Sequence, residues 1–269
     1  MFNKLLIFDL DDTLLTSEKT ITENTVEAIK ACKSKGMYIG YITGRARPPR
    51  DKLFFTDKYN LPCDYIAYYN GAEICIGDTS SVSRKSNVIP YDDAMKIIRG
   101  LREAYPNAKI SVMHEPWSYS EKSGENWNMY STEKIKCSIF ELPRYNVRRI
   151  RIEFGKNDNK NKLNDFMTEE TIFFINADGT SMILNKNATK ENALIKASEF
   201  FNVSLTNIIV FGDDINDMEM LKAAGIGVAM GNAIDVVKEI ADYITETNDN
   251  EGISIWINNH LLTTHECVL

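Results

Sequence analysis

The chain has 269 residues, of which 43% are hydrophobic and 26% are charged, and these proportions are ordinary for a globular protein of one large or two medium domains. Its formal net charge of -7 argues against nucleic acid or an anionic membrane as the main partner, because both require a basic surface. No apolar stretch approaches the roughly 20 residues of a membrane span, no signal-peptide pattern is present, and the five scattered cysteines include no CxxC pair, so we expect a cytoplasmic protein with reduced thiols.

A short apolar run at residues 4–8 is followed at once by Asp9, Asp11, Asp12 and Thr13. The run is typical of a buried strand, and alternation along it puts Asp9 and Asp11 on the same side. Packing disfavours clustered acids, because they repel one another and are costly to remove from water. A hard cation and a nucleophilic carboxylate require such a cluster, so this strand end is the first candidate site.

Strands and helices then alternate along the chain. A helix is expected from the capping residue Thr22 to Gly36. Apolar strands are expected over 37–42 and 65–69, with a further helix between them. This alternation predicts βαβ units and a parallel sheet.

Residues 79–184 have a more mixed pattern, which predicts an α+β domain inserted into the first. The core domain would then consist of residues 1–78 and 185–269, which gives an α/β fold overall. The elements expected in the insertion are helices near 92–103 and 160–167, strands near 109–113 and 148–154, and a strand pair around the hairpin signal Asp178-Gly179.

The alternating pattern resumes after the insertion. Thr189 or Asn187 is expected to cap a helix, and buried strands are expected over 208–211 and 226–229. Lys190 falls in the first turn of that helix, where a cation opposes the helix dipole. A phosphate bound at the helix terminus would relieve this conflict.

Polar groups gather where the expected strands end and the helices begin. Ligands of open α/β sheets bind outside the carboxyl ends of the strands, so one pocket can collect all of these groups. Each group alone also fits a plainer role, because strand-end aspartates form turns and caps and a helix lysine is usually solvated. Their joint occurrence favours a site. The groups are Asp9/Asp11, Thr43-Gly44, Lys190 and Asp213/Asn216/Asp217.

These residue types suit phosphoryl transfer. Asp9 is the candidate nucleophile, and Asp11 is the candidate acid and base that protonates the leaving oxygen and then activates water. Asp9 and Asp213 are expected to hold Mg²⁺ through their side chains. The groups expected to donate to the phosphate oxygens or to neutralise their developing charge are Thr43, the Gly44 amide, Asn216 and Lys190.

Six motifs span nearly the whole chain in a fixed order: Asp9-Leu-Asp-Asp-Thr-Leu14, Ile42-Thr-Gly-Arg45, Asn70-Gly-Ala72, Lys190-Glu-Asn-Ala-Leu194, Gly212-Asp-Asp-Ile-Asn-Asp217 and Asn248-Asp-Asn-Glu-Gly252. With these motifs the chain resembles the haloacid dehalogenase (HAD) superfamily, and specifically its Cof-type phosphatases with a large α/β cap. The resemblance implies a Rossmann-like parallel-sheet core and a mobile inserted cap. It also implies Mg²⁺-dependent hydrolysis of small phosphate monoesters, such as sugar phosphates, through an aspartyl-phosphate.

By matching position, the resemblance implies that Asp9 is the nucleophile and a metal ligand. Asp11 would be the acid and base and would offer its carbonyl to the metal, and Asp213 would complete the metal site. Asp217 would orient a metal-bound water or Lys190. The residues that would hold the phosphate are Thr43, Lys190 and Asn216.

Two positions depart from the family pattern. Glu191 stands where the family usually has glycine after the motif lysine. The strand before that lysine carries Met182-Ile183-Leu184, where the family often has an acid. A substrate preference is therefore not carried over from the family.

The cap is expected to set specificity through a polar-aromatic stretch that includes Trp117 and Tyr119. These side chains either line a sugar or nucleotide pocket or cover the cap sheet, as aromatic residues mostly do. Asn70 is a further possible substrate contact. The remaining members of the stretch are His114, Glu115, Trp127 and Tyr130. Three arginines either meet a second anionic group of the substrate or form a solvated helix face, namely Arg45, Arg47 and Arg50.

Two other functions remain open at this point. One is a phosphotransferase or phosphomutase that uses the same aspartyl-phosphate and excludes water. The other is a non-catalytic binding or regulatory protein, since a fold alone does not prove activity. The expected partner is a small phosphorylated metabolite, and the expected assembly is a monomer or a weak homo-oligomer.

Overall fold

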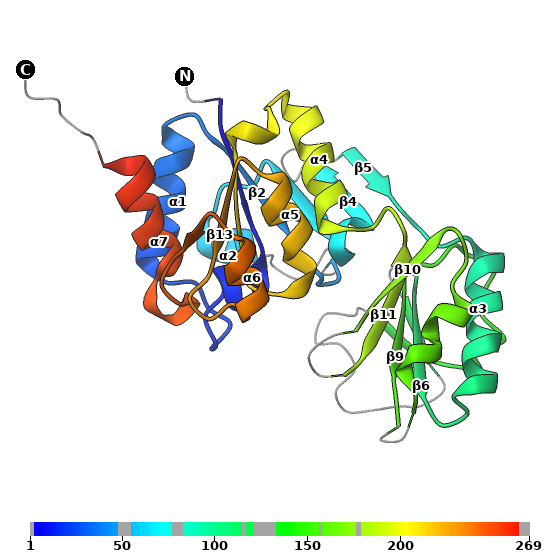
Figure 1. The fold of residues 1–269 in the computed structure, drawn as a ribbon. Helices are drawn as coiled ribbons and strands as arrows, with labels where there is room; N and C mark the ends of the chain where they lie inside the picture. The colour runs from blue at the N-terminus through cyan, green and yellow to red at the C-terminus, as the bar shows by residue number, and fades with distance from the viewer. Residues whose placement is uncertain are drawn as a thin grey trace, which may run out of the picture.

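The computed structural model of the chain describes residues 3–47, 55–76, 83–114, 117–120, 133–155, 158–175 and 179–263. It contains two sheets, each covered by helices (Figure 1). The larger sheet is mostly parallel and the smaller one is formed by a segment inserted between its strands. The predicted α/β fold with an inserted α+β domain, here called the cap, is therefore confirmed.

The core sheet has eight strands in the order β14-β13-β12-β1-β2-β3-β4-β5. Neighbours are parallel from β14 to β3, and the pairs β3–β4 and β4–β5 are antiparallel. Since β1 lies between β12 and β2, the residues that follow these three strands meet at one edge of the sheet. The strands are β1 (Leu5–Phe8), β2 (Tyr38–Ile42), β3 (Tyr65–Tyr68), β4 (Glu73–Ile76), β5 (Ser83–Ser86), β12 (Ile208–Gly212), β13 (Ile226–Ala229) and β14 (Tyr243–Ile244).

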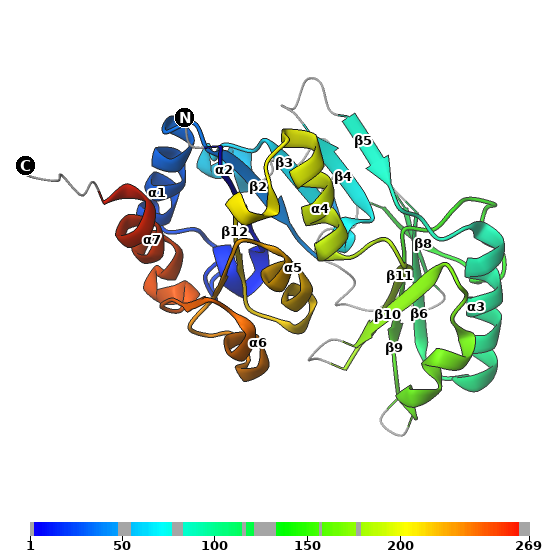
Figure 2. The same cartoon turned by 45° about the horizontal axis from the view of Figure 1, so that its top comes forward.

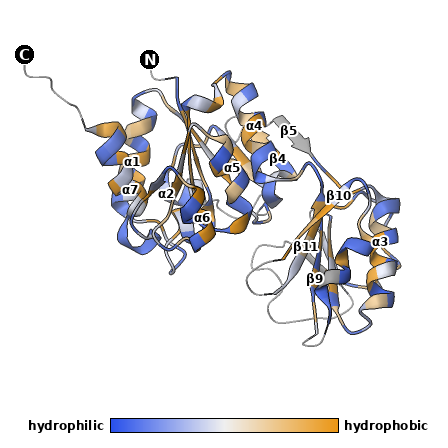
Figure 3. Cartoon of the chain, viewed as in Figure 1, coloured by the Kyte–Doolittle hydropathy of each residue, from blue (hydrophilic) through white to orange (hydrophobic). Residues whose placement is uncertain are grey.

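The core is a three-layer structure, because both faces of the sheet are apolar. Along β1, Leu6 and Phe8 belong to one buried cluster with α1 and α7, whereas Leu5 and Ile7 belong to another with α4, α5 and α6. Figure 1 shows the two groups of helices on opposite sides of the sheet, and Figure 3 shows how hydrophobic the strands between them are. The helices of the core are α1 (Glu23–Ser34), α2 (Phe55–Tyr59), α4 (Lys190–Phe201), α5 (Met218–Ala223), α6 (Asp235–Ile240) and α7 (Gly252–Ile257).

Local signals in the sequence begin and end the helices as predicted. The side chain of Thr22 accepts a hydrogen bond from the Thr25 amide at the start of α1, and Thr189 does the same for Asn192 at the start of α4. Gly36 follows α1 with a φ of +85°, a conformation that glycine adopts at little cost.

The cap contains a six-stranded sheet in the order β10-β11-β9-β6-β7-β8. Helix α3 covers one face, against which Ile150 and Ile152 of β9 are buried. The other face turns toward the core (Figure 2), so alternate residues of each strand point to the core–cap boundary. The elements are α3 (Tyr91–Ala104), β6 (Lys109–His114), β7 (Trp117–Ser120), β8 (Glu133–Lys136), β9 (Arg149–Glu153), β10 (Thr171–Ile175) and β11 (Ser181–Asn185).

Two details of the cap differ from or refine the predictions. The segment expected as a helix near 160–167 is a 3-10 helix over Lys160–Phe166. Its two apolar residues that pack on the cap, Leu163 and Phe166, are three positions apart, and this spacing matches the three residues per turn of a 3-10 helix. The predicted strand pair before and after Gly179 is present as antiparallel β10 and β11.

The chain enters the cap later than the predicted boundary at 78/79. Strand β5 remains paired with β4 in the core sheet, and Asn87 donates from its amide to the Ala72 carbonyl at 2.7 Å. The two crossing segments lie side by side, because the Asn185 side chain donates to the Val88 carbonyl at 3.0 Å. The crossing into the cap therefore falls after Asn87, the residue that follows the paired strand β5 and still bonds to the core.

Among the helices that the structure describes, none combines the length and the hydropathy needed to cross a lipid bilayer.

Candidate active site

Three carboxylates meet at the carboxyl ends of β1 and β12. The two strands are parallel neighbours, and the Asp9 amide donates to the Phe211 carbonyl at 3.1 Å. Asp9, Asp213 and Asp217 each offer a carboxylate oxygen within 4.8 Å of the others. The structure thus brings together acids that are about 200 positions apart in the sequence, at the edge where open α/β sheets bind ligands.

Lys190 lies in the middle of this acid cluster and is only 2% exposed. Its Nζ is 2.8 Å from Asp9 Oδ1 and 2.6 Å from Asp217 Oδ1. Burial disfavours the ammonium ion, but Asp217 and then Asp9 outweigh burial, so the pKa of Lys190 is raised above its ordinary value. The lysine is therefore a fixed positive charge beside the candidate nucleophile.

Asp217 holds the lysine and the adjacent loop in place. Its Oδ1 accepts from Lys190, and its Oδ2 accepts from the amides of Asp213 and Asp214, both at 3.1 Å. Gly212 allows this approach, because a Cβ on it would lie 2.7 Å from the Cβ of Asp217. With both oxygens engaged by the protein, Asp217 is suited to orient Lys190, as the family resemblance implies.

The electrostatics of the cluster fit a divalent cation. Burial raises the pKa of Asp9 well above its ordinary value; Lys190 opposes this shift, whereas Asp217 and Asp213 add to it. Burial, followed by repulsion from Asp217, raises the pKa of Asp213 to about 7. Three carboxylates against one ammonium leave negative charge uncompensated, and carboxylate oxygens are the ligands that Mg²⁺ prefers. Asp9 and Asp213 are the residues whose side chains could hold it.

Thr13 is a further member of the site, and the sequence pattern predicted no role for it. It follows Asp12, whose φ of 59° turns the chain back toward the sheet. The buried hydroxyl of Thr13 donates to Asp213 Oδ1 at 2.6 Å. The position of Thr13 directly after the three acids was the sequence signal that could have indicated a role in the site. Its partner Asp213 follows another strand, so only the fold identifies this hydrogen bond.

Asp11 is held by cations in this structure. Arg45 donates to it from Nε at 2.7 Å and from Nη2 at 2.5 Å, and Lys19 Nζ lies 3.3 Å from it. Burial opposes ionisation, but Arg45 and then Lys19 prevail and lower the pKa of Asp11 below its ordinary value. The candidate acid and base is therefore an ionised carboxylate here, and Arg45 contacts it directly.

The candidate phosphate-binding groups lie on neighbouring turns. Thr43 is buried at the end of β2, and the Asn70 amide donates to its carbonyl at 2.9 Å. Asn70 has a φ of 55°, and its Oδ1 accepts from Asn216 Nδ2 at 3.4 Å. Gly44 lies against the same side chain, since a Cβ on it would be 3.2 Å from Asn70 Oδ1. The candidate phosphate-binding residues therefore lie next to one another, namely Thr43, Gly44, Asn70 and Asn216.

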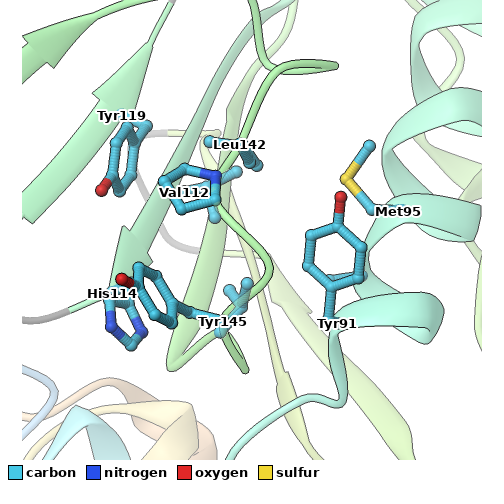
Figure 4. Close-up of a pocket in the computed structure, with 10 residues that line it drawn as sticks. Tyr91, Met95, Val112, His114, Tyr119, Leu142 and Tyr145 are labelled. Carbon is cyan, nitrogen blue, oxygen red and sulfur yellow. The ribbon is translucent and has the colours of Figure 1, made fainter.

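The aromatic residues of the cap are distributed differently. Tyr119 and His114 lie on the α3 side of the cap sheet, where they line a small cavity of ≈ 10 Å³ together with Tyr91 and Tyr145 (Figure 4). The His114 and Tyr145 rings stack with centroids 4.4 Å apart. The structure therefore does not bring Tyr119 to the acid cluster.

The other expected cap contacts are only partly described. The backbone of Trp117 pairs with His114 between β6 and β7. Glu115, Trp127, Tyr130 and Arg50 lie outside the described residues.

Arginines at the core–cap boundary were not anticipated, apart from Arg45 and Arg47. Glu73 of β4 is buried and pairs with Arg47 at 3.2 Å and with Arg148 of the cap at 2.8 Å. The next residue, Arg149, donates to the Gly44 carbonyl at 3.2 Å. Sequence offered no signal for these contacts beyond the adjacent arginines themselves, because their partners lie far away along the chain.

Comparison with known proteins adds to this geometry. The sequence model of a family described as haloacid dehalogenase-like hydrolase matches residues 6–257. The chain is 30% identical over 260 residues to the 5-amino-6-(5-phospho-D-ribitylamino)uracil phosphatase YcsE of Bacillus subtilis, with 96% of each chain covered.

Two solved structures share the fold over nearly their whole length. The HAD phosphatase BT1666 of Bacteroides thetaiotaomicron has a TM-score of 0.81 and 26% identity, with 96% of this chain and 95% of that chain covered. The HAD subclass IIB sugar phosphatase BT4131 has a TM-score of 0.79 and 25% identity, with 96% of this chain and 98% of that chain covered.

Proposed function

Because the chain belongs to the haloacid dehalogenase-like hydrolases and is a hydrolase of phosphoric monoesters, we propose that it cleaves small phosphorylated metabolites through an aspartyl-phosphate on Asp9. The observation that carries the proposal is the group formed by Asp9 and Lys190, which are buried, and Asp213, which is partly exposed. This group supports the proposal because it offers a candidate carboxylate nucleophile, a positive charge and a second candidate metal ligand at the strand ends. Sugar phosphates and related metabolites are the proposed substrates, in keeping with the activities for which the similar proteins are named.

The first chemical step assigned to this chain is attack by a carboxylate oxygen of Asp9 on phosphorus. A bond forms between Asp9 and phosphorus as the bond to the leaving oxygen breaks, and Asp11 gives a proton to that oxygen. Asp11 can carry this proton only after its ion pair with Arg45 has opened, because that ion pair keeps the Asp11 carboxylate ionised. Lys190, Thr43 and Asn216 stabilise the charge on the phosphoryl oxygens.

The second step is hydrolysis of the aspartyl-phosphate. Asp11, now ionised, takes a proton from water, the water oxygen bonds to phosphorus, and the bond to Asp9 breaks to release phosphate. Mg²⁺ held by Asp9, Asp213 and the Asp11 carbonyl would supply the positive charge that offsets repulsion between these acids and the phosphate. We also propose a cytoplasmic location, which the unpaired thiols of Cys32 and Cys63 support.

The test is phosphate release from p-nitrophenyl phosphate and a panel of sugar phosphates, with Mg²⁺ or with EDTA. Wild type is expected to need the metal, and Asp9→Asn is expected to lose turnover while keeping its circular dichroism spectrum. Asp12→Asn is the matched control, because Asp12 lies in the same turn at a φ of 59° that asparagine tolerates.

Chemical trapping distinguishes the proposed route from direct attack by water. Acid-quenched wild type should retain label from a phosphorylated substrate, and Asp9→Asn should not. Unchanged turnover in Asp9→Asn would rule out the nucleophile. A folded wild type that releases phosphate from no substrate would favour a phosphotransferase or a binding protein instead.

A further inference from the structure

The first residue of β9, Arg149, points from the cap to the loop that carries the candidate phosphate donors. It is 4% exposed. Its Nη1 donates to the Gly44 carbonyl at 3.2 Å and contacts Met182 Sδ at 3.6 Å, and its guanidinium lies 5.2 Å from the centroid of the Tyr69 ring. A cationic side chain is therefore buried at the core–cap boundary, beside the candidate active site.

The neighbouring arginines at this boundary have carboxylate partners. Arg148 pairs with Glu73 at 2.8 Å, and Arg45 pairs with Asp11. Arg151, on the same face of β9, lies 3.5 Å from a carboxylate oxygen of Glu153. Each of these positive charges is compensated by a nearby acid.

Within the part of the chain that the structure describes, Arg149 forms no ion pair. Its contacts are an amide carbonyl, a thioether and an aromatic ring, and both polar contacts are made by Nη1. Nε and Nη2 donate to none of the described residues. A buried cation without a counter-charge is costly, and burial lowers the pKa of Arg149 for the same reason.

We propose that Arg149 binds a second anionic group of the substrate, so that the preferred substrates are compact phosphate monoesters that also carry a carboxylate or a second phosphate. This inference rests on the proposed phosphatase function and names its substrate class. The fork formed by Nε and Nη2 matches the two oxygens of a carboxylate or phosphate. A neutral hydroxyl would accept a hydrogen bond but would leave the buried charge uncompensated.

The position of Gly44 explains why the substrate must be compact. The Gly44 amide is a candidate donor to the phosphate, and its carbonyl accepts from Arg149. The two anionic groups would therefore bind on opposite ends of a single residue. Arg149 is only 4% exposed beside Met182 and the Tyr69 ring, and a charge-assisted hydrogen bond is stronger in such buried surroundings.

Binding measurements on turnover-deficient protein test the proposal independently of hydrolysis. In the Asp9→Asn background, calorimetry would give the Kd of two matched ligand pairs with Mg²⁺ present. 6-Phosphogluconate against glucose 6-phosphate tests a carboxylate, and fructose 1,6-bisphosphate against fructose 6-phosphate tests a second phosphate. We expect the ligand with the second anion to bind about 10- to 100-fold more tightly in at least one pair.

Variants of the two arginines of β9 assign that preference to a side chain. Adding Arg149→Met to the Asp9→Asn protein should reduce the ratio of the two Kd values within a ligand pair to less than about threefold. Arg151→Met removes a charge from the same strand face and should leave this ratio unchanged. Arg149→Lys keeps the charge without the fork and should retain part of the preference. If Arg149→Met does not fold, the preference of Arg149→Lys for the second anion is compared with that of the Asp9→Asn protein alone, and an undiminished preference would count against Arg149.

Two results would overturn the proposal. One is equal binding of both members of both pairs by the Asp9→Asn protein. The other is an equal weakening of both members by Arg149→Met, which would mean that Arg149 only docks the cap on Gly44 and Tyr69. Failure of the phosphatase function would appear separately, as absence of phosphate release from p-nitrophenyl phosphate by wild type.

Discussion

Replacing Asp213 with asparagine is expected to make the metal-free protein more stable and the enzyme inactive. Asp213 lies within 4.8 Å of Asp9 and Asp217 by their carboxylate oxygens, so its charge opposes folding when no cation is bound. Asparagine keeps an oxygen that can accept from the Thr13 hydroxyl, which donates to Asp213 at 2.6 Å. It removes the charge that repels the other two carboxylates.

The magnitude follows from the pKa of Asp213, which burial and then Asp217 raise from 3.8 to about 7. Because the folded-state pKa is the higher one, the folded protein holds a proton between these values that the unfolded chain does not, and stability rises as the pH falls through this window. At pH 8 Asp213 is ionised in both states, so its charge lowers the free energy of unfolding by the full amount. The pKa difference between 3.8 and about 7, at about 1.4 kcal/mol for each pKa unit, gives an upper limit of about 4 kcal/mol for this effect. The side chain of Asp213 is partly exposed, and solvent weakens the charge repulsion. We therefore expect Asp213→Asn to raise the free energy of unfolding by about 1–3 kcal/mol.

The assay is urea unfolding in EDTA at pH 8 and pH 5.5. Asp213→Asn should exceed wild type at pH 8, and the gap should narrow at pH 5.5, where Asp213 is protonated in the folded wild type. Mg²⁺ should stabilise wild type and have little effect on the variant. Asp214→Asn is the matched control, since asparagine can still cap the Ile215 amide as Asp214 does at 2.8 Å. A variant less stable than wild type at pH 8, or a gap that does not change with pH, would refute the reasoning.

Lys190→Met should abolish turnover and lower stability in EDTA by about 3–5 kcal/mol at pH 8, because two buried carboxylates lose their ammonium partner; unfolding at pH 5.5 should show a smaller loss. Thr13→Val should cost about 1–3 kcal/mol in urea unfolding with Mg²⁺ present and raise the Mg²⁺ concentration needed for activity, with Thr13→Ser as the control; an unchanged Mg²⁺ requirement would contradict the role assigned to the hydroxyl. Glu73→Gln should cost about 3 kcal/mol, because a buried charge facing Arg148 is lost, and limited proteolysis should show a looser cap; an unchanged cleavage rate would show that this ion pair does not hold the cap.

The fold was predictable to a large extent because its signals are local. The run at residues 4–8 is continuous and apolar, and β1 (Leu5–Phe8) is buried on both faces as such runs predict. Thr22 and Thr189 cap their helices through bonds to residues three positions away, which is a distance that sequence inspection covers. A helix was predicted near 160–167, but its 3-10 form over Lys160–Phe166 was not, because only packing within the cap selects three residues per turn over 3.6.

The candidate site was predictable only as a set of positions. The edge of a parallel sheet explains why Asp9, Lys190 and Asp213 meet, and spacing along the chain is enough to expect it. The hydrogen-bond partners of the individual acids could not be predicted in the same way. Thr13 is 200 positions from Asp213, and Asp11 is paired with Arg45 from the next strand end.

The core–cap boundary was the least predictable region. Arg149 and Gly44 are 105 positions apart, and Glu73 meets Arg148 across two domains. The later entry into the cap has the same origin, because β5 remains in the core through its pairing with β4. None of these contacts leaves a periodic pattern in the sequence.

Residue order alone was sufficient to establish the alternating core, the inserted segment and the acids at the strand ends, since backbone geometry and hydrophobic periodicity act over a few neighbouring residues. Which carboxylate is paired, which cation is left without an acid, and which face of the cap sheet meets the core depend on groups brought together from distant parts of the chain. Charge interactions and burial act through space. Only the tertiary structure could therefore pair Asp11 with Arg45 and place Arg149 at the phosphate-binding loop.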